Sequence, residues 1–310
     1  MRVKVLGSAA GGGFPQWNCG CANCNRLRAG VLKGRARSQA QVAVSPAPGK
    51  WLLLNASPDL RQQILEYPEF APPEETRSTP ISAIFLTSAE VDCVMGLLHL
   101  REFQSLRIFA TRSVQRALTE ENAFLRVLDR ANPPVRWEVM PLEKPVTAFS
   151  DPEGTVPKSF TCTAHSLGGS FPDYVSDELR IKLREDEAVI GLECAQDGKR
   201  FFYAPNLPGR GESWKHYVRK SELAMLDGTF WMDDELVRVR AGGKSAREMG
   251  HLPLSGENGL VEQMQDAEAV RRVLIHLNNT NPAVDDESAA NRALRDAGWE
   301  IAYDGMEIDL

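Results

Sequence analysis

Short apolar runs recur along the whole chain, and most of them have the length of a β-strand. Apolar and charged positions alternate over residues 2–6, which predicts a first strand. Residues 40–45 and 50–55 predict a hairpin, because the turn-forming segment 46–49 with two prolines and a glycine separates them. Two strands joined so closely favour a mixed or antiparallel sheet.

The remaining pattern continues this mixture of short strands and helices. Further strands are predicted at residues 81–87, 107–110, 160–164, 189–195, 201–203, 223–226 and 272–276, helices at 96–101, 113–131, 260–265 and 288–297, and a closing hairpin at 299–303 with 306–310. Both halves of the chain contain strands and helices. The pattern therefore favours an α+β fold in which two sheets pack face to face with helices outside, and we expect residues 1–310 to form a single domain.

Composition and charge exclude several classes of protein. The chain has 310 residues, of which 43% are hydrophobic and 25% charged, and its net charge is −6. This balance argues against a nucleic-acid-binding surface, which needs clustered lysines and arginines. No apolar run approaches the roughly 20 residues that cross a bilayer, and the apolar run at the N-terminus is too short for a signal peptide. We expect a cytoplasmic protein without membrane insertion, and a homodimer is an alternative to a monomer.

The glycine-rich segment 7–13 follows the first predicted strand, as a nucleotide-binding loop would. Its spacing does not match a dinucleotide fingerprint, because Gln16 stands where the third glycine belongs and Pro15 stands where the helix should begin. A structural loop is the favoured interpretation.

Three of the six cysteines, Cys19, Cys21 and Cys24, fall within six residues. In a reducing compartment such a cluster indicates a metal site more than disulfides. Three thiolates suit a tetrahedral zinc ion, whose fourth ligand must come from elsewhere. A site with four protein ligands has no open position, so we expect it to be structural. Cys162 and Cys194 are expected to pack within strands. The sixth cysteine, Cys93, lies in a loop with acidic residues.

Acidic residues and histidines follow several predicted strands. His276 and Asp227 each end a strand, His251 precedes a helix, and Glu90, Asp92 and Cys93 share the loop after the strand 81–87. A strand-end aspartate usually caps a turn, and a lone histidine is usually an ordinary polar group. As a set, these residues offer imidazole and carboxylate ligands for iron, manganese or zinc, and two histidines with one carboxylate suit ferrous iron.

The other charged residues carry weaker predictions. His99 is expected to pack on an apolar helix and His216 to lie exposed on another. The segment 238–248 carries Arg238, Arg240, Lys244 and Arg247, which could attract carboxylates of a substrate, although a solvated surface is the favoured interpretation.

Five segments of the chain form distinctive motifs: LGSAAGGGFPQWNC at residues 6–19, APN at 204–206, LDGTFW at 226–231, MGHLP at 249–253 and HLNNTNP at 276–282. In these segments the chain resembles the coenzyme PQQ biosynthesis B proteins. These motifs are long and extend over nearly the whole sequence. The resemblance implies the metallo-β-lactamase fold, an αββα sandwich of two mixed sheets flanked by helices.

The resemblance also implies a role in making pyrroloquinoline quinone (PQQ) from a peptide precursor. Two activities are considered for such proteins: iron-dependent hydroxylation of the tyrosine ring in a Glu–Tyr-derived small-molecule precursor, and carriage of PQQ or its precursor to the periplasm. We favour the hydroxylase, with Fe²⁺ held by Asp92, His251 and His276, because a chain without a membrane segment cannot transport by itself. Glu90, Cys93 and Asp227 are further candidates for ligands or for residues that orient ligands. A metal-dependent hydrolase is a third alternative, from the fold alone.

This chain departs from the wider superfamily at several metal positions. Aligning Asp92 with the aspartate of the superfamily's His-x-His-x-Asp-His motif places Ser88, Glu90 and Cys93 at the histidine positions. Asn206 stands at a superfamily aspartate, which argues against a two-metal hydrolase. Asn279 stands where related phosphodiesterases have a histidine that completes the cysteine site, so the resemblance makes Asn279 the candidate fourth zinc ligand.

Overall fold

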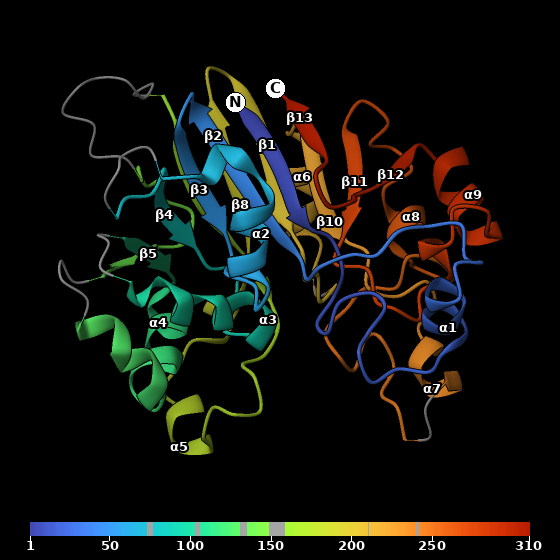
Figure 1. Cartoon of the computed structure of the whole chain (residues 1–310), viewed down its shortest axis with the longest axis horizontal. Coiled ribbons are helices and arrows are strands. Elements are labelled where there is room, and N and C mark those ends of the chain that lie inside the picture. Colours follow the sequence, from blue (N-terminus) through green and yellow to red (C-terminus); the bar gives the residue numbers. More distant parts are fainter. Residues whose placement is uncertain (73–76, 103–105, 131–134, 149–158, 210, 240–241) are drawn as a thin grey trace.

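The computed structural model describes residues 1–310 except 73–76, 103–105, 131–134, 149–158, 210 and 240–241, and contains two mixed β-sheets (Figure 1). The first sheet has the order β13-β1-β2-β3-β4-β5-β6 and the second has the order β12-β11-β10-β9-β8-β7. The strands of the first sheet are β1 (Arg2–Gly7), β2 (Gln41–Ala47), β3 (Lys50–Leu54), β4 (Ile81–Phe85), β5 (Arg107–Ala110), β6 (Arg136–Val139) and β13 (Glu307–Asp309). Those of the second are β7 (Thr161–Gly168), β8 (Val189–Gln196), β9 (Lys199–Ala204), β10 (Leu223–Asp227), β11 (Arg271–Ile275) and β12 (Trp299–Ile301).

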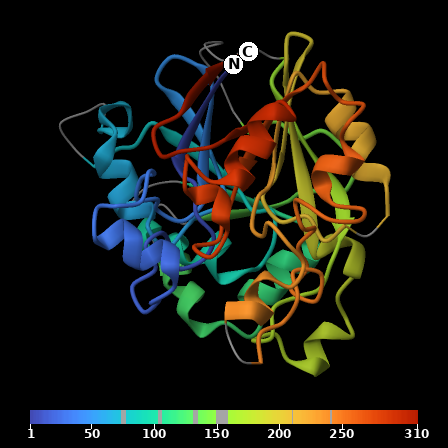
Figure 2. The ribbon, with the colours of Figure 1, turned by 90° about the vertical axis from the view of Figure 1, so that its right-hand side faces the viewer.

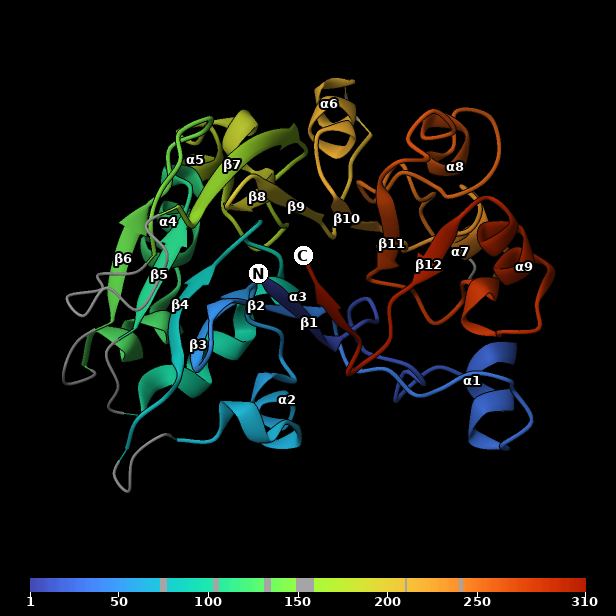
Figure 3. The same cartoon turned by 90° about the horizontal axis from the view of Figure 1, so that it is seen from above.

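The two sheets face each other and helices cover their outer sides, as the view from above shows (Figure 3). The helices are α1 (Ala22–Arg28), α2 (Leu60–Glu66), α3 (Val91–Val94), α4 (Arg112–Thr119), α5 (Asp177–Arg180), α6 (Ser213–Arg219), α7 (Glu235–Val239), α8 (Leu260–Gln263) and α9 (Ala289–Asp296). Short 3-10 helices span Pro68–Phe70, Met95–Arg101, Ala123–Arg130, Glu185–Glu187 and Pro282–Val284. The predicted α+β sandwich is confirmed.

Alternation along the strands builds both layers of the core. In β3, Leu52 and Leu54 belong to the cluster between the sheets, whereas Trp51 and Leu53 belong to the cluster under the helices. Because helices cover the outer faces, both sets of side chains are buried, and the strands therefore read as nearly continuous apolar runs. The predicted strand packing of Cys162 and Cys194 is confirmed: they lie opposite each other on β7 and β8, with their sulfurs 3.6 Å apart.

The predicted closing hairpin is wrong. β12 joins the second sheet in parallel beside β11, whereas β13 joins the first sheet antiparallel to β1. The connection passes from one sheet to the other, with Ala302 N donating to Leu274 O and Gly305 N donating to Val5 O. These two neighbouring strands separate because β12 pairs with the preceding strand β11, whereas β13 pairs with β1 at the other end of the chain.

Other boundaries also differ from the sequence predictions. The helix predicted at 113–131 is divided into α4 and the 3-10 helix Ala123–Arg130, and residue 131 lies outside the described part of the chain. The helix predicted at 96–101 is a 3-10 helix. The sequence analysis missed β6 and α1; the latter begins just after Cys21, so Cys24 lies on a helix and not in a loop.

Parallel pairing brings the chemically important residues to one edge. β9, β10 and β11 are mutually parallel, as are β3, β4 and β5. Asp227 ends β10, His276 follows β11, and α3 with Asp92 follows β4.

The side view shows the N-terminal loop and α1 packed beside the C-terminal part of the chain (Figure 2). No helix in the described residues is long and apolar enough to cross a membrane.

Candidate metal centres

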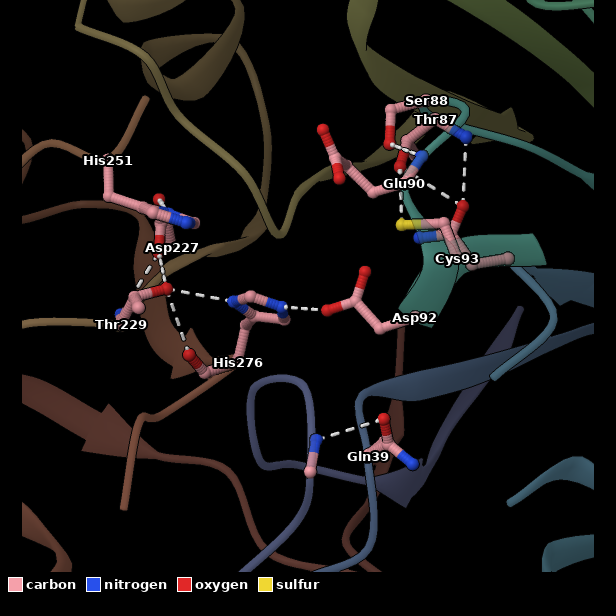
Figure 4. A network of polar contacts seen from close by, with 12 residues as sticks. Gln39, Thr87, Ser88, Glu90, Asp92, Cys93, Asp227, Thr229, His251 and His276 are labelled. Atoms are coloured by element: carbon pink, nitrogen blue, oxygen red, sulfur yellow. Dashed lines mark hydrogen bonds and ion pairs between the residues drawn. The ribbon is translucent and has the colours of Figure 1, made fainter. Parts of the chain in front are cut away.

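His276 lies between two oxygen-bearing side chains (Figure 4). Its Nε2 is 2.8 Å from Asp92 Oδ2, and its Nδ1 is 2.8 Å from Thr229 Oγ1. The Thr229 hydroxyl has one proton and lies 2.6 Å from Asp227 Oδ1, which can only accept when ionised. The hydroxyl therefore donates to Asp227 and accepts from the Nδ1–H of His276. This arrangement directs Nε2 of His276 toward Asp92 and the cavity.

Asp227 holds the second histidine. Its Oδ2 lies 2.7 Å from His251 Nδ1 and accepts from the backbone N–H of Leu207 at 2.9 Å. Its Oδ1 accepts from the N–H and hydroxyl of Thr229. Both carboxylate oxygens are therefore already engaged, so Asp227 is placed to orient His251 and, through Thr229, His276. The two imidazole rings are nearly parallel, with centroids 5.6 Å apart.

The backbone around His276 helps to hold the two histidines in place. His276 has a φ of 64°, in the left-handed region that few non-glycine residues adopt. Asn281 donates to Gly228 O at 2.9 Å, which ties the segment after His276 to the turn after Asp227. The glycine-rich loop also contributes, because a Cβ on Gly11 would lie 3.4 Å from Asp92 Oδ2. The loop at Gly11 thus lies directly beside the Asp92 carboxylate, at a distance where a Cβ would make an ordinary van der Waals contact.

These side chains line a cavity of about 160 Å³. Its wall is formed by Ala40, Asn55, Glu90, Asp92, Cys93, Pro205, Asn206, Met249, His251 and His276. Of the predicted candidates, the structure thus brings together Glu90, Asp92, Cys93, His251 and His276, with Asp227 directly behind the histidines. The ligand-capable atoms of Asp227, His251 and His276 lie within 4.8 Å of one another.

At Asp92, Asp227 and His276, burial and the neighbouring charges shift the pKa in opposite directions. Burial raises the pKa of Asp92 and of Asp227, but the neighbouring histidines outweigh it and hold both values below the usual range. Burial lowers the pKa of His276, but the hydrogen bond and charge of Asp92 outweigh it and raise the value. Burial and the charge of Asp92 raise the pKa of Glu90 to about 7 and that of Cys93 well above its usual value.

Thr229, Asn55 and Met249 are among the residues of this site that the sequence analysis missed. Thr229 bridges Asp227 and His276, and its place two residues after a strand-end aspartate was a usable signal, since Asp side chains often bond to the backbone two residues on. Met249 lines the cavity, but no pattern in the sequence distinguishes it.

The cysteine cluster forms a second centre, with all three sulfurs close together. Nδ2 of Asn279 lies 3.0 Å from the sulfur of Cys19, 3.5 Å from that of Cys21 and 3.4 Å from that of Cys24. Asn23 donates to the backbone oxygens of Asn279 and Asn281, each at 3.1 Å. The predicted candidate Asn279 thus lies over the three sulfurs, and the cluster joins the N-terminal segment to the segment after His276.

The remaining charged candidates lie away from the cavity lining. His216 is exposed on α6, as predicted. The prediction that His99 packs is wrong: it lies exposed on the 3-10 helix Met95–Arg101, whose buried side is formed by Leu97 and Leu100. Arg238 pairs with Asp234 at 2.7 Å, and Arg247 donates to the backbone of Glu257 and Asn258. Lys244 is exposed, and Arg240 lies outside the described residues.

The chain is similar over its full length to proteins of one family. It is 38% identical to the coenzyme PQQ synthesis protein B of Stutzerimonas stutzeri and 40% identical to that of Azoarcus sp. (strain BH72), with 100% of each chain covered in both alignments. The chain belongs to the coenzyme PQQ synthesis protein B family. The family model described as "Beta-lactamase superfamily domain" matches residues 50–277 of this family member.

A solved structure of the same family has the same fold. The crystal structure of Zn(2+)-bound PqqB from Methylobacterium extorquens superposes with a TM-score of 0.90 at 36% identity, covering 100% of both chains. The crystal structure of a diphosphatase from the PhnP family superposes with a TM-score of 0.65 at 16% identity, covering 100% of the present chain and 97% of the diphosphatase. This likeness shows the shared fold alone. The predicted resemblance to the PQQ biosynthesis B proteins and to the metallo-β-lactamase fold is therefore confirmed.

Proposed function

We propose that this chain acts in PQQ biosynthesis as an Fe²⁺- and O₂-dependent hydroxylase of the tyrosine ring in a Glu–Tyr-derived precursor. Membership in the coenzyme PQQ synthesis protein B family supports the role in PQQ biosynthesis. The hydroxylase assignment rests above all on one observation. His276, His251 and Asp92 line one cavity, with the Nδ1 atom of each histidine already held by another residue.

The residues present fit a ferrous ion. Asp92 Oδ2 and His276 Nε2 are 2.8 Å apart, and the ring centroids of His276 and His251 are 5.6 Å apart. Asp92, His276 and His251 would hold the metal, which is the two-histidine, one-carboxylate set that suits oxygen-activating iron and leaves positions open. When bound, the iron would supply the activation of O₂. Thr229 and Asp227 would fix the tautomer and direction of the two imidazoles.

The size and charge of the cavity favour a phenol over PQQ itself. A cavity of about 150 Å³ can hold one benzene ring, and this one is about 160 Å³. PQQ has three fused rings and three carboxylates, and the described lining residues include no lysine or arginine to bind them. These observations favour hydroxylation of a single ring over the carrier alternative.

The three cysteines would hold a structural zinc ion. Their sulfurs lie close together with a side-chain amide over them, and the related structure is described as Zn(2+)-bound. The amide presents Nδ2 to the sulfurs, so Asn279 would serve as fourth ligand only after a half-turn that exchanges Nδ2 for Oδ1. Such a site would have no open position and would stabilise the loop that follows His276.

The test uses the full chain loaded with Fe²⁺ under anaerobic conditions. A tyrosine-containing diamino acid, ¹⁸O₂ and a two-electron reductant are then added. One oxygen atom should enter the ring, increasing the product mass by 18 Da with ¹⁸O₂ or 16 Da with ¹⁶O₂, and the other should leave as water. Tight PQQ binding without O₂ uptake would support a carrier, and cleavage of a chromogenic diester with Mn²⁺ would support a hydrolase. Either result in place of hydroxylation would overturn the proposal.

A further inference from the structure

Cys162 and Cys194 stand directly opposite each other on the antiparallel strands β7 and β8, which lie side by side in Figure 3. Their sulfurs are 3.6 Å apart, and both side chains are fully buried in the apolar cluster between the two sheets. The other four cysteines of the chain belong to the cysteine cluster or line the cavity. Neither of the two candidate metal centres therefore accounts for this pair.

The backbone hydrogen bonds show which kind of cross-strand pair this is. The N–H and the carbonyl of Cys162 both bond to Val146, on the side of β7 away from β8, at 2.9 and 2.8 Å. Cys162 and Cys194 are therefore a non-hydrogen-bonded pair, in which the opposed Cα atoms lie about 4.5 Å apart. A disulfide spans Cα separations of about 4.4–6.8 Å. Rotation of the two side chains can thus bring the sulfurs from van der Waals contact to bonding distance without moving the strands apart.

We propose that Cys162 and Cys194 form an oxidisable pair, which a peroxide converts reversibly into a cross-strand disulfide. This modification site goes beyond the proposed function and does not depend on it. One sulfur attacks hydrogen peroxide, so that the O–O bond breaks, a sulfenic acid forms and water leaves. The second sulfur then attacks the first, the S–O bond breaks, and a second water leaves with the remaining thiol proton. Each sulfur loses one electron, and the peroxide gains both.

The position of the pair determines how fast it reacts. Burial raises the pKa of Cys162 well above its usual value, so little of the reactive thiolate exists in the closed structure. However, β7 is the last strand of the second sheet, and its outer edge is covered at Cys162 by the hydrogen bonds to Val146. Local opening of such an edge admits a molecule as small as hydrogen peroxide. Oxidation should therefore be slow and should favour small oxidants.

The disulfide would close residues 162–194 into a loop. This stretch includes Tyr174, whose hydroxyl donates to Ala89 O, and Ile190, whose N–H donates to Thr87 O. Both acceptors lie in the segment between β4 and α3, so the loop packs beside the cavity. Because a cross-link removes conformational freedom from the unfolded chain, the oxidised protein should have a Tm roughly 5 °C higher.

The experiment treats the full, zinc-loaded chain with excess hydrogen peroxide, removes the oxidant with catalase, and alkylates the remaining thiols after unfolding. Trypsin then separates the two cysteines, because cleavage after lysine and arginine leaves Cys162 in the peptide 159–180 and Cys194 in the peptide 185–199. We expect mass spectrometry to find these peptides joined, with the mass of both less two hydrogen atoms. Dithiothreitol should release them, and calorimetry should show the higher Tm before reduction.

Two variants assign the bond. Cys194→Ser should abolish both the joined peptides and the rise in Tm. Cys93→Ser is the matched control, because it removes another buried cysteine and leaves the pair intact. This control should still form the joined peptides.

Three results would overturn the inference. They are full alkylation of Cys162 and Cys194 after peroxide treatment, a bond from either of them to a third cysteine, and a lower Tm in the joined form, which would show that the bond does not fit the folded strands. None of these measurements involves hydroxylation, so failure of this inference is distinguishable from failure of the proposed function.

Discussion

The cavity cluster (Asp92, His251 and His276) and the cysteine cluster (Cys19, Cys21 and Cys24) can both bind metal, but they are built in different ways. The three cysteines come from one short segment, and the Asn279 side chain covers them. The cavity cluster draws its residues from three distant segments, and it faces open space of about 160 Å³. A covered cluster suits a structural ion, and an open one suits chemistry.

The two clusters are also connected. His276 belongs to one and Asn279, three residues later, contacts the other. The cysteine cluster therefore anchors the segment that positions a histidine of the cavity. Loss of the cavity metal should leave the cysteine cluster intact, whereas loss of the zinc should disturb both.

The largest expected effect comes from Asp92→Ala. Removing this carboxylate should lower hydroxylation by about 10³-fold or more, because metal assistance contributes several kcal/mol to lowering the barrier. Elemental analysis should find the iron lost and zinc still near one per chain. Loss of both zinc and iron would contradict this expectation, because it would show that zinc binding by the cysteine cluster depends on Asp92.

Removing a cysteine should act mainly on stability. We expect Cys24→Ser to lose zinc and to lower Tm by roughly 10 °C, with reduced activity as a consequence of the displaced His276 segment. Cys162→Ala is the matched control, since Cys162 is equally buried but lies outside the cluster. That variant should keep its zinc. Calorimetry and metal analysis check both variants, and unchanged Tm in a zinc-free Cys24→Ser protein would contradict a structural role.

A smaller effect is expected where a residue orients a ligand. Thr229→Val keeps the shape of the side chain but removes the hydroxyl that joins Asp227 to His276. Activity should fall about 10- to 100-fold, with weaker iron binding, and zinc content should not change. Steady-state kinetics with an iron titration measure this, and wild-type iron affinity in the variant would contradict the orienting role.

The smallest effect is on pH dependence. Glu235 on α7 accepts from Trp231 N and Thr280 Oγ1, and burial raises its pKa to about 7. Because this folded-state pKa lies above the unfolded value of about 4.3, the folded chain retains the proton longer, and stability falls as pH rises from about 4 through about 7. Glu235→Gln should therefore reduce the Tm difference between pH 5 and pH 8 by about 2 °C. An unchanged Tm difference in the variant would contradict the raised pKa of Glu235.

The fold was largely predictable from the sequence because its strands are strongly apolar. β3 and β9 are buried on both faces, so their apolar runs stand out against polar connections. The closing hairpin failed because alternation along 299–310 shows that strands form but not which partners they choose. Partner choice depends on pairing of β12 with β11 and of β13 with β1, which lies at the other end of the chain.

The candidate site was predictable to the level of residue type. Asp227 and His276 were singled out because each ends a strand, and parallel pairing of β10 with β11 then places them at one edge. The difference between a ligand and an orienting residue was not accessible, because it depends on the hydrogen bonds that occupy Asp227. The bridge through Thr229 and the position of Asn279 over the sulfurs likewise depend on tertiary contacts.

The left-handed backbone of His276 has a consequence for large mutational surveys. At a φ of 64°, asparagine and glycine fit the backbone with little strain, whereas β-branched residues such as valine and isoleucine do not. A survey scored by the abundance of folded protein should therefore rank asparagine and glycine above valine and isoleucine at this position. A survey scored by activity should find all four equally inactive, so position 276 should separate selection for folding from selection for chemistry.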